Sequence, residues 1–149
     1  MIRAAGLSDV DALTALEQDA FGPDAWSREQ VAAEVAGASR HVVVAARDDV
    51  VTGYASLLAT GDTADVARIA VVPGQRRTGV GRRLLSALLG ESERRGVERV
   101  LLEVASDNHA AIGLYEAGGF VAIATRPHYY RSGADAVVME RRSVPRRDG

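Results

Sequence analysis

The sequence contains no cysteine and no lysine, because all 18 of its basic residues are arginine. Without cysteine there can be no disulfide, no thiolate catalysis and no zinc site with cysteine ligands. Without lysine there can be no Schiff-base lysine and no Walker-type phosphate loop, which ends in Gly-Lys-Ser/Thr. The chain also lacks a run of about 18 apolar residues and a signal-like apolar core near its start, which predicts a soluble cytoplasmic protein with no membrane partner.

The remaining composition is that of an ordinary globular domain, with 149 residues of which 47% are hydrophobic and 26% charged. The net charge of −2 hides two unlike halves. Residues 1–65 carry 4 Arg and 11 acidic residues, whereas residues 66–149 carry 14 Arg and 9 acidic residues. The chain as a whole is not basic enough to predict nucleic-acid binding. Its second half has the charge to hold a phosphorylated ligand, and a solvated arginine-rich surface is the alternative.

Hydrophobic periodicity predicts a mixed α/β fold of order β-α-α-β-β-β-α-β-α-β-β. The expected strands are Ile2–Ala4, His41–Ala46, Val51–Leu58, Ala64–Val72, Val100–Val104, Phe120–Thr125 and Ala136–Met139. The expected helices begin near Ser8, at Ser27, at Val80 and at Asn108, and the last two run to Arg95 and Ala117. We therefore expect one domain over residues 1–141, with a mixed sheet of about seven strands flanked by four helices, and a polar tail over residues 142–149.

Local signals support the helix boundaries. Ser27 and Gln30 form a capping-box pattern, and Ser8 followed by Asp11 resembles one. Gly37 and Gly96 have the positions of helix stop signals.

The loop between the strand Ala64–Val72 and the helix at Val80 is the most informative segment. Gly79 and Gly81 allow a ligand to approach the backbone, and the start of a helix offers unpaired N–H groups to a phosphate. A dinucleotide fingerprint is excluded, since this loop follows the fourth strand rather than the first. The residues alone leave a pyrophosphate site of another type, or a simple turn with solvated arginines.

This loop resembles a known motif. Arg76-x-x-Gly79-x-Gly81, after Val71-x-Pro73, is similar to the acetyl-CoA motif of the GNAT N-acetyltransferases. The resemblance continues through Leu101–Val104, Asn108, Ala111–Glu116 and Gly119-Phe120, and covers the chain from about Trp26 to Met139.

The resemblance implies a GNAT-like fold with acetyl-CoA as cosubstrate. In that family the loop amides hold the CoA diphosphate, and the preceding strand pairs with the pantetheine arm. Carried over by position, the pantetheine residues are Ile69, Ala70 and Val71, and the diphosphate residues are Arg76, Arg77, Thr78, Gly79, Val80, Gly81 and Arg82.

A carboxylate, Glu103, lies inside the apolar run Val100–Val104. One interpretation is a strand-end glutamate paired with an arginine. The other is a general base whose pKa is raised by apolar neighbours. Amine acetylation needs such a base, because an ammonium group has no lone pair with which to attack a thioester.

Asn108 and Tyr115 are seven residues apart, about two helical turns, and should face the same way. They are either a helix cap and a core ring, or an amide that binds the cofactor and a phenol that protonates the departing thiolate.

Glu103, Asn108 and Tyr115 resemble the base, the CoA-binding amide and the acid of the RimI-type enzymes, which acetylate the N-terminal alanine of a small-subunit ribosomal protein. Trp26-Ser27 and Arg126-x-x-Tyr129-Tyr130 agree with this subfamily, and imply that Trp26, Tyr129 and Tyr130 flank the acceptor. Ala105 stands where RimI-type chains often have arginine, a departure that bears on peptide preference.

The leading hypothesis is an acetyl-CoA-dependent N-acetyltransferase that acts on a protein N-terminus by direct transfer, since no cysteine exists to carry the acyl group. A small-amine acetyltransferase and a non-catalytic acyl-CoA-binding module are the alternatives, and Glu103 with Tyr115 argues against the module. Seven acidic residues lie in or near the first two expected helices: Asp9, Asp11, Glu17, Asp19, Asp24, Glu29 and Glu34. The resemblance places these helices beside the acceptor, which predicts a preference for peptides that start with alanine and continue with basic residues. No metal is expected, because His41, His109 and His128 lack metal-ligand spacing.

Overall fold

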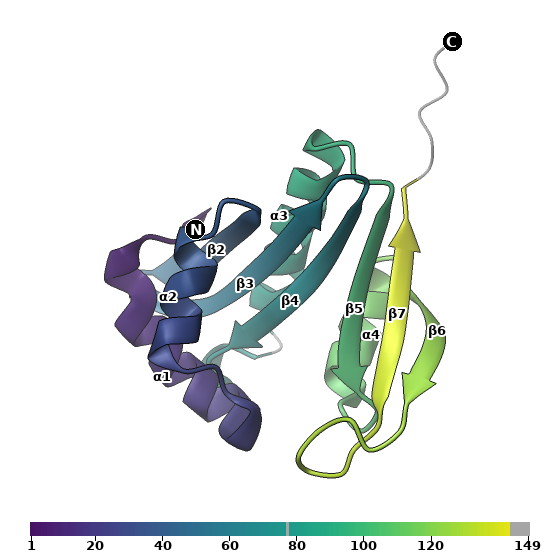
Figure 1. Cartoon of the computed structure of the whole chain (residues 1–149). Coiled ribbons are helices and arrows are strands. Elements are labelled where there is room, and N and C mark those ends of the chain that lie inside the picture. Colours follow the sequence, from purple (N-terminus) through teal and green to yellow (C-terminus); the bar gives the residue numbers. More distant parts are fainter. Residues whose placement is uncertain (77, 144–149) are drawn as a thin grey trace.

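The computed structural model describes residues 1–76 and 78–143 (Figure 1). In this part of the chain one seven-stranded sheet has the order β1-β2-β3-β4-β5-β7-β6. Its strands are β1 (Ile2–Ala4), β2 (Arg40–Arg47), β3 (Val50–Thr60), β4 (Thr63–Val71), β5 (Arg99–Ala105), β6 (Val121–Arg126) and β7 (Ala136–Arg142). Among these strands only β4 and β5 pair in parallel, because a helix connects them, and the other pairs are antiparallel.

Four α-helices cover the described sheet, two on each face (Figure 1). They are α1 (Val10–Phe21) and α2 (Arg28–Ala36) on one face, and α3 (Val80–Arg94) and α4 (His109–Ala117) on the other. Short 3₁₀ helices precede α1 (η1, Leu7–Asp9), follow it (η2, Gly22–Asp24) and follow β4 (η3, Pro73–Gln75). The predicted fold class and element order are confirmed. No helix of the described residues has the length and apolar character needed to cross a bilayer.

Each face of the sheet has its own hydrophobic core. The leucine stripe of α3, which includes Leu84 and Leu88, packs against Val100 and Leu102 of β5. On the opposite face, Leu13 of α1 packs with residues of α2, β2 and β3. These two cores hold the helices against the two faces of the sheet.

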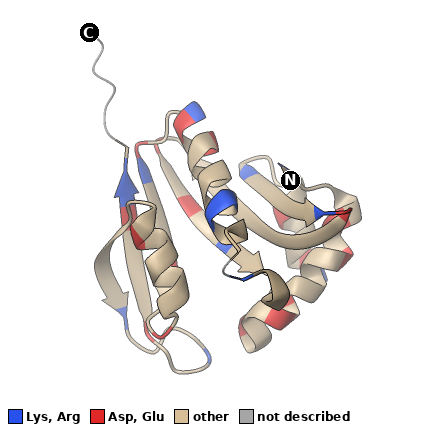
Figure 2. Ribbon diagram, turned by 180° about the vertical axis from the view of Figure 1, so that it is seen from behind, with Lys and Arg blue, Asp and Glu red and all other residues tan. Residues whose placement is uncertain are grey.

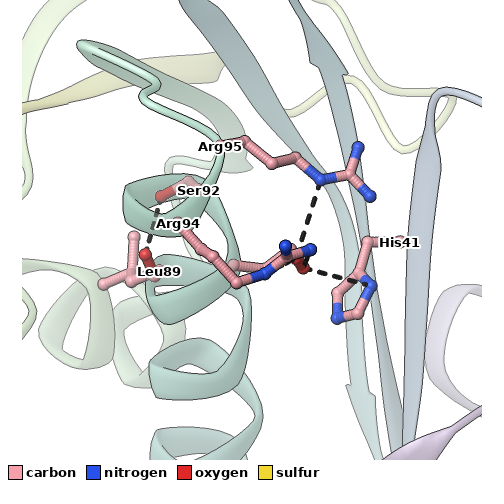
Figure 3. Close-up of polar contacts among 6 residues, drawn as sticks. His41, Leu89, Ser92, Arg94 and Arg95 are labelled. Carbon is pink, nitrogen blue, oxygen red and sulfur yellow. Dashed lines mark hydrogen bonds and ion pairs between the residues drawn. The ribbon is translucent and has the colours of Figure 1, made fainter.

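The C-terminal end of α3 is tied to β2 by a cluster of polar contacts (Figure 3). The buried carboxylate of Glu91 accepts hydrogen bonds from Arg94 and lies 3.7 Å from Nε of Arg95. Nδ1 of His41 is 3.8 Å from the same carboxylate. Ser92 Oγ donates to the Leu89 carbonyl over 2.8 Å. This cluster orients the far end of α3, away from the glycine loop.

Two helix starts were predicted from capping patterns, and one of them is wrong. Ser27 and Gln30 cap α2 reciprocally, as predicted. The pair Ser8 and Asp11 does not cap α1, because η1 intervenes and α1 begins at Val10. Asp9 is the N-cap residue of α1 without a side-chain cap bond there, and its carboxylate accepts the Gly6 N–H over 2.8 Å at the start of η1.

The predicted polar tail begins too early. Arg142 is the last residue of β7 and pairs with Arg99 of β5. Ser143 donates its side-chain hydroxyl to the Val97 carbonyl over 2.9 Å. The sheet therefore extends into the segment predicted as tail, and residues 144–149 lie outside the described part.

The parallel pairing of β4 with β5 is short. It runs from Thr63 and Arg99 to Val66 and Leu102, and stops there. A one-residue bulge at Ala67 changes the register of β4 against β3 at the same point. Beyond it the two strands separate, so the backbone of Ala67–Val71 is unpaired on its β5 side.

Candidate active site

Two cavities open where β4 and β5 separate. The glycine-loop cavity has a volume of about 510 Å³ and is lined by Ile69, Val71, Arg76, Gly79, Gly81, Arg82, Ala110, Ala111, Leu114 and Tyr115. The Glu103 cavity, of about 550 Å³, is lined by Glu103 with residues from the α1–α2 segment, β4, β5, the start of α4 and the loop before β7. The two share Ile69, Ala111 and Tyr115, so the cavities meet at these three residues.

The glycine loop presents backbone N–H groups to the first cavity. Gly79 is the N-cap of α3 and has φ of +89°, a left-handed conformation that disfavours side chains. The Arg83 N–H donates to the Gly79 carbonyl over 3.1 Å, so the amides of Val80, Gly81 and Arg82 lie in the unpaired first turn. At Gly81 an added Cβ would lie 3.4 Å from Leu114, which shows how closely α3 approaches α4. The loop has the geometry of an anion site.

The predicted diphosphate residues divide into two groups. Arg82 lines the glycine-loop cavity at the start of α3, where basic residues are visible in Figure 2. Arg76 also lines it, but its Nε donates to the Val71 carbonyl over 3.1 Å and its Nη2 lies 3.5 Å from Asp19. The Arg76 guanidinium is thus shared with α1.

The remaining loop residues have other positions. The Thr78 hydroxyl donates to the Gln75 carbonyl, within the loop. The Val80 side chain is buried in the core below α3, so only its backbone can face a ligand. Arg77 lies outside the described residues.

Strand β4 offers alternate side chains to the same cavity. Ile69 and Val71 line it, whereas the Ala70 side chain is buried on the opposite face with the α1 and α2 core. This follows from the two-residue period of a strand. Ala70 can contribute only its backbone to a ligand in the cavity.

Of the two interpretations of Glu103, the structure shows the contact of the first, because its Oε1 lies 3.5 Å from Nη2 of Arg126. Its side chain is 30% exposed, so it is not enclosed by its apolar neighbours in the sequence. The physical reason is strand alternation: Leu102 and Val104 face the core on the α3 and α4 side, and Glu103 faces the other way. Helices α1 and α2 cover only the β2–β4 part of that face (Figure 1), so the carboxylate opens into the cavity.

Several titratable groups surround Glu103. The Glu103 charge is the main cause that raises the pKa of Tyr129, and it adds to burial in raising the pKa of Tyr130 to about 12. The pKa of Asp65 is raised by burial and by the same charge. Arg126 lies over the Tyr129 ring at 5.7 Å. A cationic amine that approaches Glu103 therefore meets a partly exposed carboxylate beside phenols that stay neutral.

Tyr115 lies at the junction of the two cavities. It is 7% exposed and packs edge-to-face on Phe120 with ring centroids 5.9 Å apart. Burial raises the pKa of Tyr115 to about 12. Its phenol therefore keeps its proton at neutral pH, as a proton donor must.

Asn108 is a helix cap. Its Oδ1 accepts the Ala111 N–H over 3.2 Å at the start of α4. It lines the Glu103 cavity together with Tyr115, as the seven-residue spacing predicts, and is not part of the glycine-loop lining. Its predicted contact with the cofactor stays a prediction.

Of the three aromatic residues predicted around the acceptor, Tyr130 lines the Glu103 cavity. Trp26 and Tyr129 are not part of its lining, and they lie next to it, Trp26 against Arg68 and Tyr129 against Arg126 and Tyr130. Sequence reasoning placed Asp24 near the acceptor, but missed Arg68 and the wall residues Ala20, Phe21 and Pro23. The signal for Arg68 was available, since it is a lone charge in an otherwise apolar half-strand.

A family model decides the relationship of this chain to known proteins. The model of the Acetyltransferase (GNAT) family matches residues 10–120, which is most of the chain. The chain belongs to the GNAT acetyltransferase family. Among the described residues, no three His, Asp or Glu side chains are grouped so that they could hold a metal ion.

Individual GNAT relatives are also similar. The chain is 39% identical over 142 residues to the N-alpha-acetyltransferase RimI of Mycobacterium tuberculosis, covering 91% of this chain and 88% of that one. It is 41% identical over 140 residues to an uncharacterized protein of Mycobacterium leprae, and spans only 38% of the length of that relative. The solved ribosomal-protein-S18-alanine N-acetyltransferase of Escherichia coli superposes with a TM-score of 0.90 at 32% identity, covering 100% of this chain and 97% of that one.

Proposed function

We propose that this protein transfers the acetyl group of acetyl-CoA directly to a primary amine, and that the acceptor is the N-terminal alanine of a small-subunit ribosomal protein. The observation that carries the proposal is the pair of cavities that meet at Tyr115, one with the glycine loop and the other with Glu103. The names of the relatives, N-alpha-acetyltransferase RimI and ribosomal-protein-S18-alanine N-acetyltransferase, support this acceptor.

The glycine-loop cavity fits acetyl-CoA in two respects. The amides of Val80, Gly81 and Arg82 would hold its diphosphate at the positive end of the α3 dipole. The backbone of β4 beyond Val66 has an edge that β5 does not pair, and it would bind the amides of the pantetheine arm. The thioester would then reach the junction at Tyr115.

The chemistry follows from the groups at the junction. Glu103 accepts a proton from the ammonium form of the acceptor. The neutral amine attacks the thioester carbonyl carbon, a C–N bond forms and the C–S bond breaks. The Tyr115 phenol donates its proton to the departing thiolate, whose pKa is near that of a cysteine thiol, about 8.5. The resulting phenolate takes up the second proton that the amine nitrogen loses as it becomes an amide, and Glu103 releases its own proton to solvent. Since the chain has no cysteine, no acyl-enzyme on sulfur precedes the transfer.

The deciding experiment measures acetyl-CoA turnover against a panel of N-terminal peptides and small amines, with intact mass as the readout. We expect acetylation of peptides that begin with alanine, at the α-amine. If free small amines are acetylated and no peptide is, the acceptor assignment is wrong while the acetyl-CoA chemistry stands. If no amine reacts, the protein is a binding module and the catalytic roles of Glu103 and Tyr115 fall.

A further inference from the structure

One wall of the Glu103 cavity comes from the segment that joins α1 to α2. Ala20, Phe21, Pro23 and Asp24 line the cavity there. Ala20 and Phe21 form the end of α1, and Pro23 and Asp24 lie in η2, which begins at Gly22 with φ of +49°. Contacts with the sheet hold this short segment in its position.

Arg68 of β4 makes those contacts. Its guanidinium carbon lies 4.1 Å from the centre of the Phe21 ring and 4.5 Å from the centre of the Trp26 ring. Its Nη2 donates to the Asp24 carbonyl over 2.7 Å. One side chain therefore holds the beginning, middle and end of the segment Phe21–Trp26.

A buried carboxylate fixes Arg68 in turn. Glu17 of α1 is fully buried, and its Oε2 lies 3.3 Å from Nε of Arg68. Tyr54 of β3 donates its hydroxyl to the same oxygen, and the Trp26 N–H donates to Oε1 over 2.8 Å. A buried charge needs this degree of pairing, so the cluster has one arrangement rather than many.

We propose that Arg68 is a positioning residue for the acceptor: it holds the Phe21–Trp26 segment against β4 as a wall of the Glu103 cavity, and so determines which acceptors fit. This inference rests on the proposed function in one respect, that the Glu103 cavity receives the acceptor. Arg68 lines the Glu103 cavity and does not line the glycine-loop cavity. Its loss should therefore act on the acceptor and leave acetyl-CoA binding unchanged.

The shape of the guanidinium matters as much as its charge. A planar group can stack between two rings while donating in its own plane, whereas an ammonium group cannot do both. Arg68→Lys should therefore recover part of what Arg68→Met loses, but not all of it.

The test compares Arg68→Met and Arg68→Lys with the matched control Arg28→Met. Arg28 also links the two helices, because its Nε pairs with Asp11 over 2.9 Å, but it is exposed and lies outside both cavities. For each variant we would measure the KM of the acceptor, the KM of acetyl-CoA and the acrylamide quenching of Trp26, the single tryptophan of the chain.

We expect Arg68→Met to raise the acceptor KM about tenfold, the loss that goes with one stacked, charge-assisted contact, while the KM of acetyl-CoA stays within about twofold. Trp26 should become more accessible to quencher in Arg68→Met, less so in Arg68→Lys, and not in Arg28→Met. Added acceptor should reduce the quenching of the wild type.

Two results would overturn the inference. One is an unchanged acceptor KM with unchanged Trp26 quenching in Arg68→Met. The other is an equal rise in the KM of both substrates, which would mean that Arg68 supports the whole fold. If Arg68→Met does not fold, Phe21→Leu removes one stacking face and leaves the Glu17–Arg68 pair, and the same two outcomes decide. Failure of the proposed function is distinct: the wild type would acetylate no amine, while Trp26 quenching would still test the wall.

Discussion

The glycine-loop cavity and the Glu103 cavity are similar in size but differ in how they are built. The first is formed mainly by two helix segments and one strand edge, and the groups proposed to bind its ligand are backbone amides at the start of α3. The second is formed by side chains from five separate parts of the chain, including the α1–α2 segment and the loop before β7. Backbone amides tolerate many side chains, whereas a side-chain cavity changes with each substitution. The cofactor half should therefore be general and the acceptor half selective.

The largest effect should come from a substitution in the glycine loop, where backbone amides line the first cavity. Gly79→Glu places a side chain at a left-handed position and a negative charge at the anion site. It should abolish the rise in melting temperature caused by acetyl-CoA. Without the substitution, a hundredfold excess of ligand over Kd adds about 2.7 kcal/mol to the free energy of unfolding. Thermal unfolding with and without acetyl-CoA measures this.

Gly79→Ala is the control for that experiment. It imposes the same backbone strain without a charge, and its Cβ would meet no atom within 4 Å. It should keep most of the acetyl-CoA shift. An undiminished shift in Gly79→Glu would mean that the diphosphate is bound elsewhere.

The next largest effect concerns Glu103 itself, in the cavity formed by side chains. Glu103→Gln should lower kcat about a hundredfold at neutral pH and leave the affinity for acetyl-CoA unchanged. The deficit should shrink above pH 8, where an α-amine of pKa about 7.7–8.0 loses its proton without help. Rate profiles from pH 6 to 10 provide the measurement. The matched control is Glu116→Gln, because Glu116 is an exposed residue of α4 outside both cavities. If Glu103→Gln is as active as this control, Glu103 is not the base and serves only as the ion-pair partner of Arg126.

Tyr115 lines both cavities, so its substitution tests the group at their junction. Tyr115→Phe should lower kcat about tenfold, less than Glu103→Gln, because a thiolate is a good leaving group even without a proton. With a pKa of about 12, the phenol remains protonated through pH 10, so wild type and variant should have pH profiles of the same shape. A wild-type decline near pH 10 that Tyr115→Phe lacks would show that the phenol ionises there.

The smallest effect tests the acidic first half. Five of its seven helix-region acids form ion pairs: Asp9, Asp11, Glu17, Asp19 and Glu34. Asp24 alone among the seven lines the Glu103 cavity within the described residues. Added salt should therefore lower kcat/KM for a basic peptide by only about twofold and hardly affect a neutral one.

Asp24→Asn should remove that salt dependence, and Asp19→Asn, which contacts Arg76 on the cofactor side, should not. Equal salt effects in the two variants would contradict steering by Asp24.

The two halves also differ in how far the sequence predicts them. The glycine loop is contiguous, so its motif could be recognised, and Gly79, Gly81 and Arg82 line the glycine-loop cavity, whereas their contact with a diphosphate stays a prediction. The burial of Glu103 could not be predicted, because the residues on both sides of it are apolar and conceal which face the strand turns to the core. The charge of Arg68 stands out within β4, but its role could not be predicted because its carbonyl partner, Asp24, is 44 residues away in the chain. Such a contact exists only once α1 has packed on β4.

The junction between the cavities has a practical consequence for ligand design. A molecule that occupies both cavities would pass Ile69, Ala111 and Tyr115, which line both of them. The bridge of a bisubstrate inhibitor, between the sulfur of coenzyme A and the acceptor nitrogen, would thus have to fit beside these three side chains. A short bridge would also give the second half a high effective concentration once the first is bound. Its selectivity among related enzymes would then come from the peptide half, since the coenzyme half meets mostly backbone.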